Sequence, residues 1–182
     1  MLAEDETDLL LFPPLRSAWA KRGQQAQVSL TGRNARRVLF GALNLRTGHR
    51  VLLVRPKQQA GDFCAFLEDV ARRYAGRHVV LLLDSDPSHT AVRSQRLAER
   101  LGITMLWLPV RSPELNPMDH LWRSAKQNVS ANRQYVNIDL LAERVIRYLV
   151  RLTPRAALRK AGVLSGHFWL KLALSKNFPG PT

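Results

Sequence analysis

Three aspartates in this sequence have the type and spacing to act together on a phosphodiester. Asp5 lies in the acidic run EDETD, Asp84 follows the apolar run VVLLL, and Asp119 lies in NPMDHLW, with 34 residues between Asp84 and Asp119. Phosphodiester cleavage needs an activated attacking oxygen and a stabilised leaving oxygen, and two divalent cations provide both. Mg²⁺ prefers hard oxygen ligands. The three side chains are therefore candidate ligands of a metal-dependent nuclease site.

Each aspartate also has a purely structural interpretation. Asp5 fits a solvated acidic terminus, and Asp84 fits a polar turn or a helix N-cap after a strand. Asp119 would be the third residue of a helix that Asn116 caps and Pro117 begins, where a carboxylate favours the helix dipole. Taken singly, each residue type is explained by structure alone, so the surrounding elements have to distinguish the two interpretations.

The surrounding pattern predicts an α/β fold. HVVLLLDSD and ITMLWLP are continuous apolar runs of the kind found in strands buried on both faces, and a helical pattern over 90–100 joins them. Such a crossover places both strands in one sheet. The other expected elements are a strand stub near 1–5, a hairpin formed by RRVLFGALNL and HRVLLVRP, a helix over 62–74, a helix after RSPELNP and an amphipathic helix LLAERVIRYLVRL. We expect a mixed five-stranded sheet, with three antiparallel strands followed by two parallel ones, flanked by helices.

The charge balance favours a polyanionic partner. The chain of 182 residues has 28 Lys and Arg against 14 Asp and Glu, a net charge of +14, and no acidic residue follows Glu143. Nucleic acid is the obvious partner, since basic residues release counterions from phosphates; an unusually basic solvated surface is the alternative. The single Cys64 excludes an internal disulfide framework. No apolar stretch is long enough for a membrane span and the N-terminus is acidic, so we expect a cytoplasmic protein.

The order of three motifs resembles a known family. DETDLLLFPPLRSAWAKRGQ, LLLDSDPSHTA and LWLPVRSPELNPMDHLWRSAK together resemble the catalytic domain of mariner-like insertion-sequence transposases, which belong to the DDE superfamily and have a ribonuclease-H-like fold. The resemblance runs from about Ala3 to Lys126, and the spacing of the last two carboxylates is typical of the mariner superfamily. It implies that Asp5, Asp84 and Asp119 are catalytic residues that bind two Mg²⁺ or Mn²⁺ ions.

The resemblance also has departures. The family usually has Asn after its second Asp, where this chain has Ser85, and Asp86 replaces a small residue. A helix-turn-helix region precedes the catalytic domain in the family, whereas four residues precede Asp5. We therefore expect residues 1–150 to be an N-terminally truncated catalytic domain and residues 151–182 to be a basic tail or helix packed on it.

The DNA contacts that we expect come mainly from basic residues. The resemblance assigns His89 to orienting a carboxylate or phosphate, and Arg111 lies beside the loop that carries Asp119. The other candidates for phosphate contact are Lys21, Arg22, Arg36 and Arg37, although isolated basic pairs are usually only surface.

The function implied is metal-dependent DNA cleavage and strand transfer in transposition. Expected partners are transposon-end and target DNA, a second copy in a homodimer, and a separately encoded helix-turn-helix portion. The alternative is a non-catalytic remnant that binds DNA without sequence preference.

Overall fold

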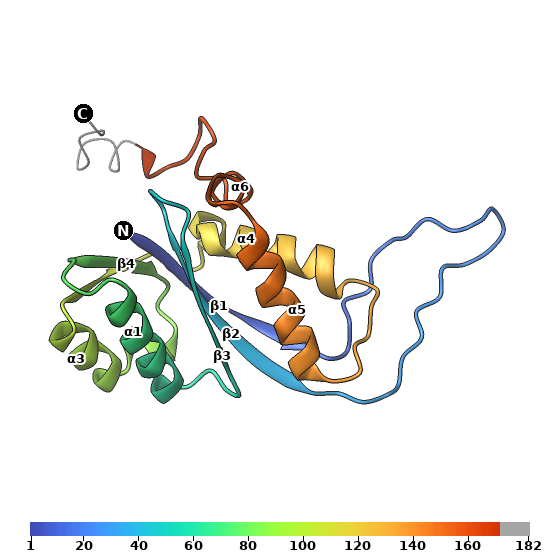
Figure 1. Ribbon diagram of the computed structural model, residues 1–182, viewed down its shortest axis with the longest axis horizontal. Helices are drawn as coiled ribbons and strands as arrows, with labels where there is room; N and C mark the ends of the chain where they lie inside the picture. The colour runs from blue at the N-terminus through green and yellow to red at the C-terminus, as the bar shows by residue number, and fades with distance from the viewer. Residues whose placement is uncertain (172–182) are drawn as a thin grey trace.

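A computed structural model describes residues 1–171 and confirms the expected sheet. Its strand order is β3-β2-β1-β4-β5 (Figure 1). The first three strands along the chain are antiparallel neighbours, and β1, β4 and β5 are parallel. The strands are β1 (Leu2–Leu10), β2 (Arg36–Asn44), β3 (Arg50–Arg55), β4 (Val79–Leu83) and β5 (Ile103–Trp107).

Helices cover both faces of this sheet (Figure 1). Helices α1 and α3 pack on one face around Phe40, Phe63 and Phe66, while α4 and α5 pack on the other around Met118 and Trp122. Burial on both faces explains why β4 is continuously apolar. The helical elements are α1 (Ala60–Arg73), α2 (Pro87–Thr90), α3 (Val92–Arg100), the 3₁₀ turn η1 (Pro113–Leu115), α4 (Pro117–Ala125), the π-helical turn η2 (Lys126–Ser130), α5 (Ile138–Arg151) and α6 (Pro154–Lys160).

The first strand is longer than the sequence suggested. The expectation of a stub ending near Asp5 is wrong, because β1 continues to Leu10 and pairs with β2 along its whole length. Asp5 consequently lies in the middle of a strand. Leu9 and Leu11 are both buried in the core, so the period of two continues beyond the acidic run. Two residues separate the end of β1 from the proline pair that begins at Pro13.

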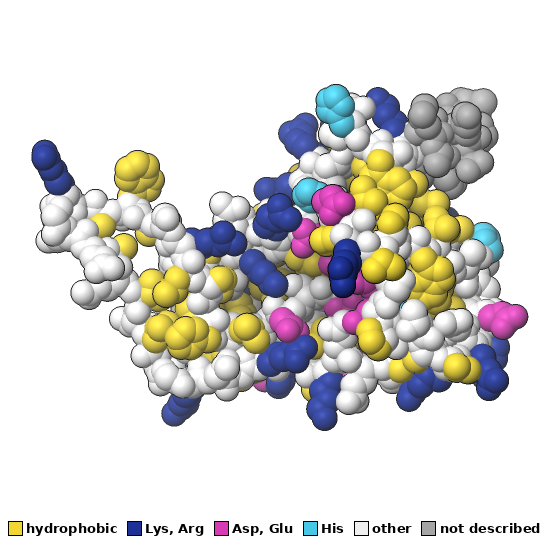
Figure 2. All heavy atoms as spheres, turned by 180° about the vertical axis from the view of Figure 1, so that it is seen from behind, with side chains coloured by type: hydrophobic (Ala, Val, Ile, Leu, Met, Phe, Trp, Pro, Cys, Tyr) yellow, Lys and Arg dark blue, Asp and Glu magenta, His cyan; other side chains and the backbone are white. Residues whose placement is uncertain are grey.

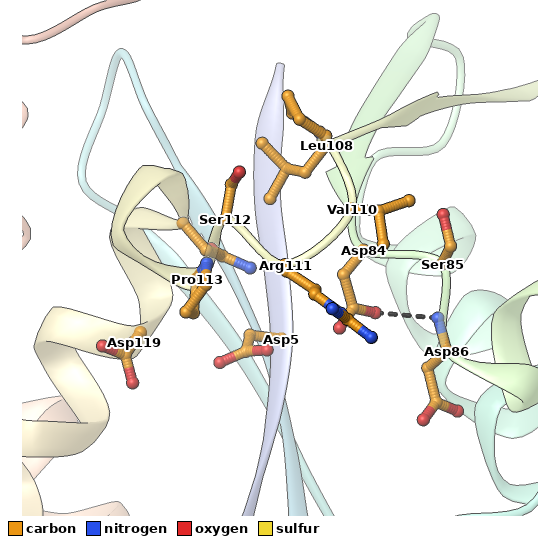
Figure 3. Close-up of a pocket in the computed structure, with 12 residues that line it drawn as sticks. Asp5, Asp84, Ser85, Asp86, Leu108, Val110, Arg111, Ser112, Pro113 and Asp119 are labelled. Atoms are coloured by element: carbon orange, nitrogen blue, oxygen red, sulfur yellow. Dashed lines mark hydrogen bonds between the residues drawn. The ribbon is translucent and has the colours of Figure 1, made fainter.

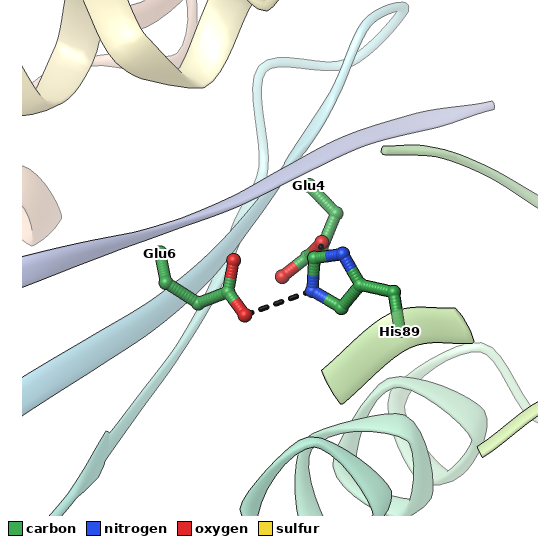
Figure 4. Close-up of side chains that lie close together, drawn as sticks. All are labelled: Glu4, Glu6 and His89. Atoms are coloured by element: carbon green, nitrogen blue, oxygen red, sulfur yellow. Dashed lines mark hydrogen bonds and ion pairs between the residues drawn. The ribbon is translucent and has the colours of Figure 1, made fainter. Parts of the chain in front are cut away.

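The helix expected over 90–100 begins two residues later, as α3 at Val92, and a separate short helix, α2, precedes it. Asp86 caps α2 by accepting a hydrogen bond from the Ser88 backbone N–H, and Pro87 begins the helix. Ala91 then adopts an extended conformation, with φ −55° and ψ 135°, before α3 begins. The short α2 turn positions His89 beneath the sheet, where Figure 4 shows its side chain.

A long connection between β1 and β2 stands away from the body (Figures 1 and 2). This arm, residues 11–35, contains no helix or strand, and the side chain of Trp19 within it is fully exposed. Its base is closed by the Leu11 N–H, which donates to the Ala35 carbonyl, and by Arg16, whose N–H donates to Asn132. Within residues 1–171 no helix is long and apolar enough to cross a bilayer.

Candidate metal-dependent nuclease site

The three predicted aspartates line one cavity of about 380 Å³, although they come from three different elements (Figure 3). Asp5 comes from the middle of β1, Asp84 directly follows β4, and Asp119 lies in the first turn of α4. The parallel register pairs Ala3 with Leu82, so Asp5 is level with Asp84 two residues further along. Convergence of the three side chains on one cavity is what the sequence interpretation required.

Helix α4 is held against the sheet by a hydrogen bond to β1 and by close packing over β2. The Asn116 side chain caps the helix by accepting from the Met118 N–H at 3.0 Å, and its amide donates to the Glu4 carbonyl of β1 at 2.7 Å. Gly41 pairs with Asp5 across the β1–β2 ladder, and a Cβ there would lie 2.5 Å from the Trp122 ring of α4. The missing side chain therefore lets the helix that carries Asp119 approach the sheet closely.

The cavity carboxylates repel one another. Burial, followed by the charges of Glu6, Asp84 and Asp119, raises the pKa of Asp5 to about 8. Asp84 shifts the other way: its pKa is lowered mainly by the hydrogen bond from His89, against an opposing effect of burial. Asp119 forms an ion pair with Arg123 at 2.7 Å. The cavity thus concentrates negative charge that a bound cation would neutralise.

A second acidic cluster lies on the opposite side of β1, because successive side chains of a strand alternate between faces (Figure 4). His89 is almost fully buried, and its ring nitrogens bond to Asp84 Oδ1 at 3.0 Å and Glu6 Oε1 at 2.8 Å. Glu4 Oε2 lies 3.6 Å from His89 Nε2, and among residues 1–171 neither oxygen of Glu4 has a hydrogen-bond partner. Burial lowers the pKa of His89, but Glu4, Asp84 and Glu6 outweigh it and raise that pKa to about 12.

The burial of His89 corrects one expectation. A side chain that is 1% exposed and enclosed by β1 and α1 cannot contact DNA, so the prediction of His89 as a DNA-binding residue is wrong. Its position agrees with the other role expected of it, orientation of a carboxylate. Sequence interpretation missed Glu4 and Glu6, although alternation along EDETD indicates that they share the face opposite Asp5.

Within residues 1–171, Glu4, Glu6 and His89 are also the one set of three acidic, His or Cys side chains whose ligand atoms all lie within 4.8 Å of one another. The cavity aspartates are nevertheless the stronger candidates for metal ligands. The side chains of His89 and Glu6 are buried and already bonded directly to each other. The cavity that the aspartates line is open to solvent. Asp5, Asp84 and Asp119 also supply the hard oxygen donors that Mg²⁺ and Mn²⁺ prefer.

The predicted basic residues occupy different places. Arg111 lines the cavity and has a left-handed backbone, φ 61°, a costly conformation often found at functional sites. Arg36 pairs with Asp8 at 2.8 Å and Arg37 with Asp139 at 3.0 Å, both near the base of the arm. Lys21 and Arg22 are exposed on the arm itself and do not line the cavity. Figure 2 shows Lys and Arg side chains around a central group of acidic ones.

Sequence interpretation also missed Lys126. This half-buried lysine follows α4 two helical turns after Asp119. Burial lowers its pKa, while the charges of Asp8, Asp119 and Asp5 act in the opposite direction. It therefore adds a cation beside the cavity carboxylates, within a π-helical turn of the kind frequent at functional sites.

Comparison with known sequences identifies the family. The sequence model of the DDE superfamily endonucleases matches residues 1–142. The chain belongs to this superfamily. It is 27% identical over 153 residues to a 39 kDa protein of insertion element IS630 from Shigella sonnei. This alignment covers 83% of the chain and 45% of that protein. It is also 36% identical over 63 residues to the Tcb2 transposase of Caenorhabditis briggsae, covering 35% of the chain and 23% of the transposase.

Solved structures show the same fold. The mariner Mos1 paired-end complex with Mg aligns with a TM-score of 0.70 at 18% identity, over 95% of this chain and 54% of that one. The catalytic domain of Mos1 mariner transposase aligns with a TM-score of 0.62 at 16% identity, over 88% of this chain and 74% of that one. The ribonuclease-H-like fold and the mariner-like resemblance are thus confirmed. The chain spans under half the length of the IS630 protein that it resembles.

Proposed function

We propose that this DDE superfamily chain is the catalytic domain of a transposase that cleaves DNA strands and transfers them to target DNA. The observation that carries the proposal is the convergence of Asp5, Asp84 and Asp119, from three elements, on one open cavity. The Mos1 structures, solved as complexes with a transposon end and with Mg or Mn, support DNA as substrate and a divalent cation as cofactor. Residues 1–150 form the proposed catalytic unit.

In this proposal Asp5, Asp84 and Asp119 hold two Mg²⁺ or Mn²⁺ ions. When bound, the ions supply activation of the attacking oxygen and charge stabilisation on the leaving oxygen. The residues present fit such ions because their donors are carboxylate oxygens. Burial and then the neighbouring carboxylates raise the pKa of Asp5, and a cation would relieve the repulsion among them. Asp119 has to share its carboxylate with Arg123, which now holds one oxygen of it.

The chain's own residues position the DNA. Arg111 lies at the cavity with its guanidinium available for the phosphate beside the cleaved bond, since Arg matches phosphate bidentately. Lys21, Arg22, Arg36 and Arg37 provide sequence-independent contacts to the backbone at and beyond the base of the arm. In the first step water attacks the phosphorus, the P–O3′ bond breaks and a 3′ hydroxyl and a 5′ phosphate are left. In the second step the freed 3′ hydroxyl attacks a phosphorus of the target DNA, and the target's own 3′ oxygen leaves and takes up a proton.

The assembly is part of the same proposal. Pairing of two transposon ends calls for two catalytic domains, so we propose a homodimer that works with a helix-turn-helix portion supplied separately. The proposed setting is the cytoplasm, on nucleoid DNA if the source is bacterial. The basic tail proposed for 151–182 includes residues 172–182, which lie outside the described residues. Helix α6, which precedes them, packs against α4.

Nicking of supercoiled plasmid with Mn²⁺ or Mg²⁺ tests the proposal. We expect Asp84→Asn to abolish metal-dependent nicking while DNA affinity in a gel shift stays equal or rises, because a negative charge near phosphate is lost. Glu99→Gln, which removes one exposed carboxylate on α3, is the matched control and should nick like wild type. Equal nicking by wild type and Asp84→Asn would refute the proposal, and DNA binding without any nicking would identify the non-catalytic alternative.

A further inference from the structure

One oxygen of Asp84 is fixed from behind, and the other is free. Asp84 Oδ1 accepts a hydrogen bond from His89 Nδ1 at 3.0 Å, shared with the Asp84 carbonyl oxygen at 3.1 Å, and another from the Asp86 backbone N–H at 3.0 Å. Within the described residues, Asp84 Oδ2 has no hydrogen-bond partner, and the side chain is 57% exposed towards the cavity. Two donors on one oxygen set the rotation of the carboxylate. Oδ2 is then available to a group bound in the cavity.

The imidazole that provides one of these donors is itself immobilised. His89 Nε2 bonds to Glu6 Oε1 at 2.8 Å, and the ring packs against Phe63 with 4.4 Å between ring centroids. Because both ring nitrogens are engaged, the ring cannot flip without breaking two hydrogen bonds. The α2 turn that carries His89 is also held, since the Asp86 side chain caps it. Glu6 on β1 therefore restrains His89, and His89 in turn restrains the side chain of Asp84.

This connection joins two elements that supply separate cavity carboxylates. Glu6 is adjacent to Asp5 on β1, whereas Asp84 directly follows the last residue of β4. The two strands are paired only at Leu2–Leu81 and Ala3–Leu82, so no ladder hydrogen bonds continue as far as the aspartates. The His89 bridge spans the sheet where the backbone pairing has stopped.

We propose that His89, anchored by Glu6, is a positioning residue that fixes Asp84 Oδ1 so that Oδ2 faces the bound cation. The proposal rests on the proposed function, because it gives Asp84 a metal to bind. Partners that orient a metal ligand typically change metal affinity by about 10–100-fold when they are removed. The bridge should therefore be measurable as a change in the metal requirement.

Two substitutions separate the two ring nitrogens. In His89→Asn the amide nitrogen takes the place of Nδ1, which keeps the donor to Asp84 and loses the link to Glu6. In His89→Gln the amide nitrogen takes the place of Nε2, which keeps the link to Glu6 and loses the donor to Asp84. A residue needed only for folding would treat the two alike, whereas a residue that orients Asp84 would not.

The experiment titrates Mn²⁺ against each protein with a DNA duplex present, reading bound Mn²⁺ by electron paramagnetic resonance and plasmid nicking in parallel. We expect His89→Gln to need about tenfold more Mn²⁺ or above, and His89→Asn to recover at least part of that loss. His78→Gln, an exposed histidine before β4, is the control and should match wild type. Melting temperatures of the two His89 variants check that folding is affected similarly.

The outcomes distinguish the positioning role of His89 from the proposed function. Equal Mn²⁺ requirements for His89→Gln and His89→Asn overturn the positioning role. Wild type that binds Mn²⁺ but does not nick refutes the proposed function, while the order of the variants in Mn²⁺ binding still tests the positioning role. Wild type that binds no Mn²⁺ overturns both. Should His89→Gln not fold, Glu6→Ala loosens the same ring, and an unchanged Mn²⁺ requirement in that variant overturns the positioning role.

Discussion

Replacing Gly41 by Ala should disturb the site without touching any of its carboxylates. Gly41 lies on β2 opposite Asp5, and α4 packs directly over it. An added Cβ would lie 2.5 and 2.6 Å from two ring carbons of Trp122 and 2.7 Å from the terminal methyl of Met118. Non-bonded carbons are in optimal contact at about 3.5–4.0 Å, so the helix must retreat by roughly 1 Å.

The size of the effect follows from this overlap. Forcing an extra methyl group into a packed core typically costs about 1–3 kcal/mol of unfolding free energy. For a protein of this size that corresponds to a melting temperature lower by roughly 2–12 °C. Asp119 lies one turn before Trp122 on the same helix, so it moves with it. A misplacement of about 1 Å in a catalytic arrangement can cost roughly 100-fold in rate, so nicking should fall more than stability does.

The assay compares melting temperature and Mn²⁺-dependent nicking for Gly41→Ala, Gly41→Ala with Trp122→Leu, and Gly166→Ala. The double variant restores room for the methyl group and should recover part of the stability. Gly166, where a Cβ would meet nothing within 4 Å, is the matched control and should behave as wild type. A Gly41→Ala protein with wild-type stability and nicking would refute the claim that this glycine sets the position of α4.

Three further predictions concern the pH, a helix cap and a partly buried arginine. Because the pKa of Asp5 is about 8 when folded and near 3.8 when unfolded, the free energy of unfolding without divalent cation should fall as the pH rises from about 4 to 8. Urea unfolding at several pH values should show a flatter profile for Asp5→Asn, and an equally steep profile in that variant would contradict the assignment. Asn116→Ala removes a helix cap and a bond to β1, so chemical denaturation should show a loss of about 1–3 kcal/mol. Arg50→Met leaves three backbone carbonyls near Gly48 and the end of α5 without their donor, and should lower the melting temperature while nicking at 25 °C is retained; unchanged melting would show that water replaces the guanidinium.

Much of the fold could be predicted because its central elements carry strong local patterns. The apolar runs of β4 and β5 predict strands, and the helix between them has clear periodicity. β4 is buried as expected, whereas β5 is an edge strand with Leu106 42% and Trp107 39% exposed, so the expectation that β5 is buried on both faces is wrong. The start of α4 was predictable in detail, since Asn116 and Pro117 are preferred at the positions where the structure has them. Local chemistry alone therefore fixes where Asp84 and Asp119 lie on their elements.

The rest depends on contacts that a single sequence does not display. The length of β1 is set by pairing with β2, whose residues lie between 26 positions (Leu10–Arg36) and 42 positions (Leu2–Asn44) further along the chain. The polar residues Asp5 and Glu6 therefore concealed the strand. The burial of His89 depends on Glu4 and Glu6 across the sheet, and nothing near His89 in the sequence indicates these partners. Charge counts likewise predicted a basic surface but not that Arg36 and Arg37 are engaged in ion pairs.

The position of β1 between β2 and β4 determines when the site can exist at all. β2 and β3 are joined by a tight connection, and β4, α3 and β5 are consecutive, so both groups can form from local contacts. β1 has no such neighbour: the arm separates it from β2, and its other partner follows more than a helix later. Closing long loops slows folding, so β1 should be the last strand to insert. Asp5 meets Asp84 and Asp119 only when β1 joins the β2–β3 hairpin to the β4–β5 pair, so the cavity forms late in folding.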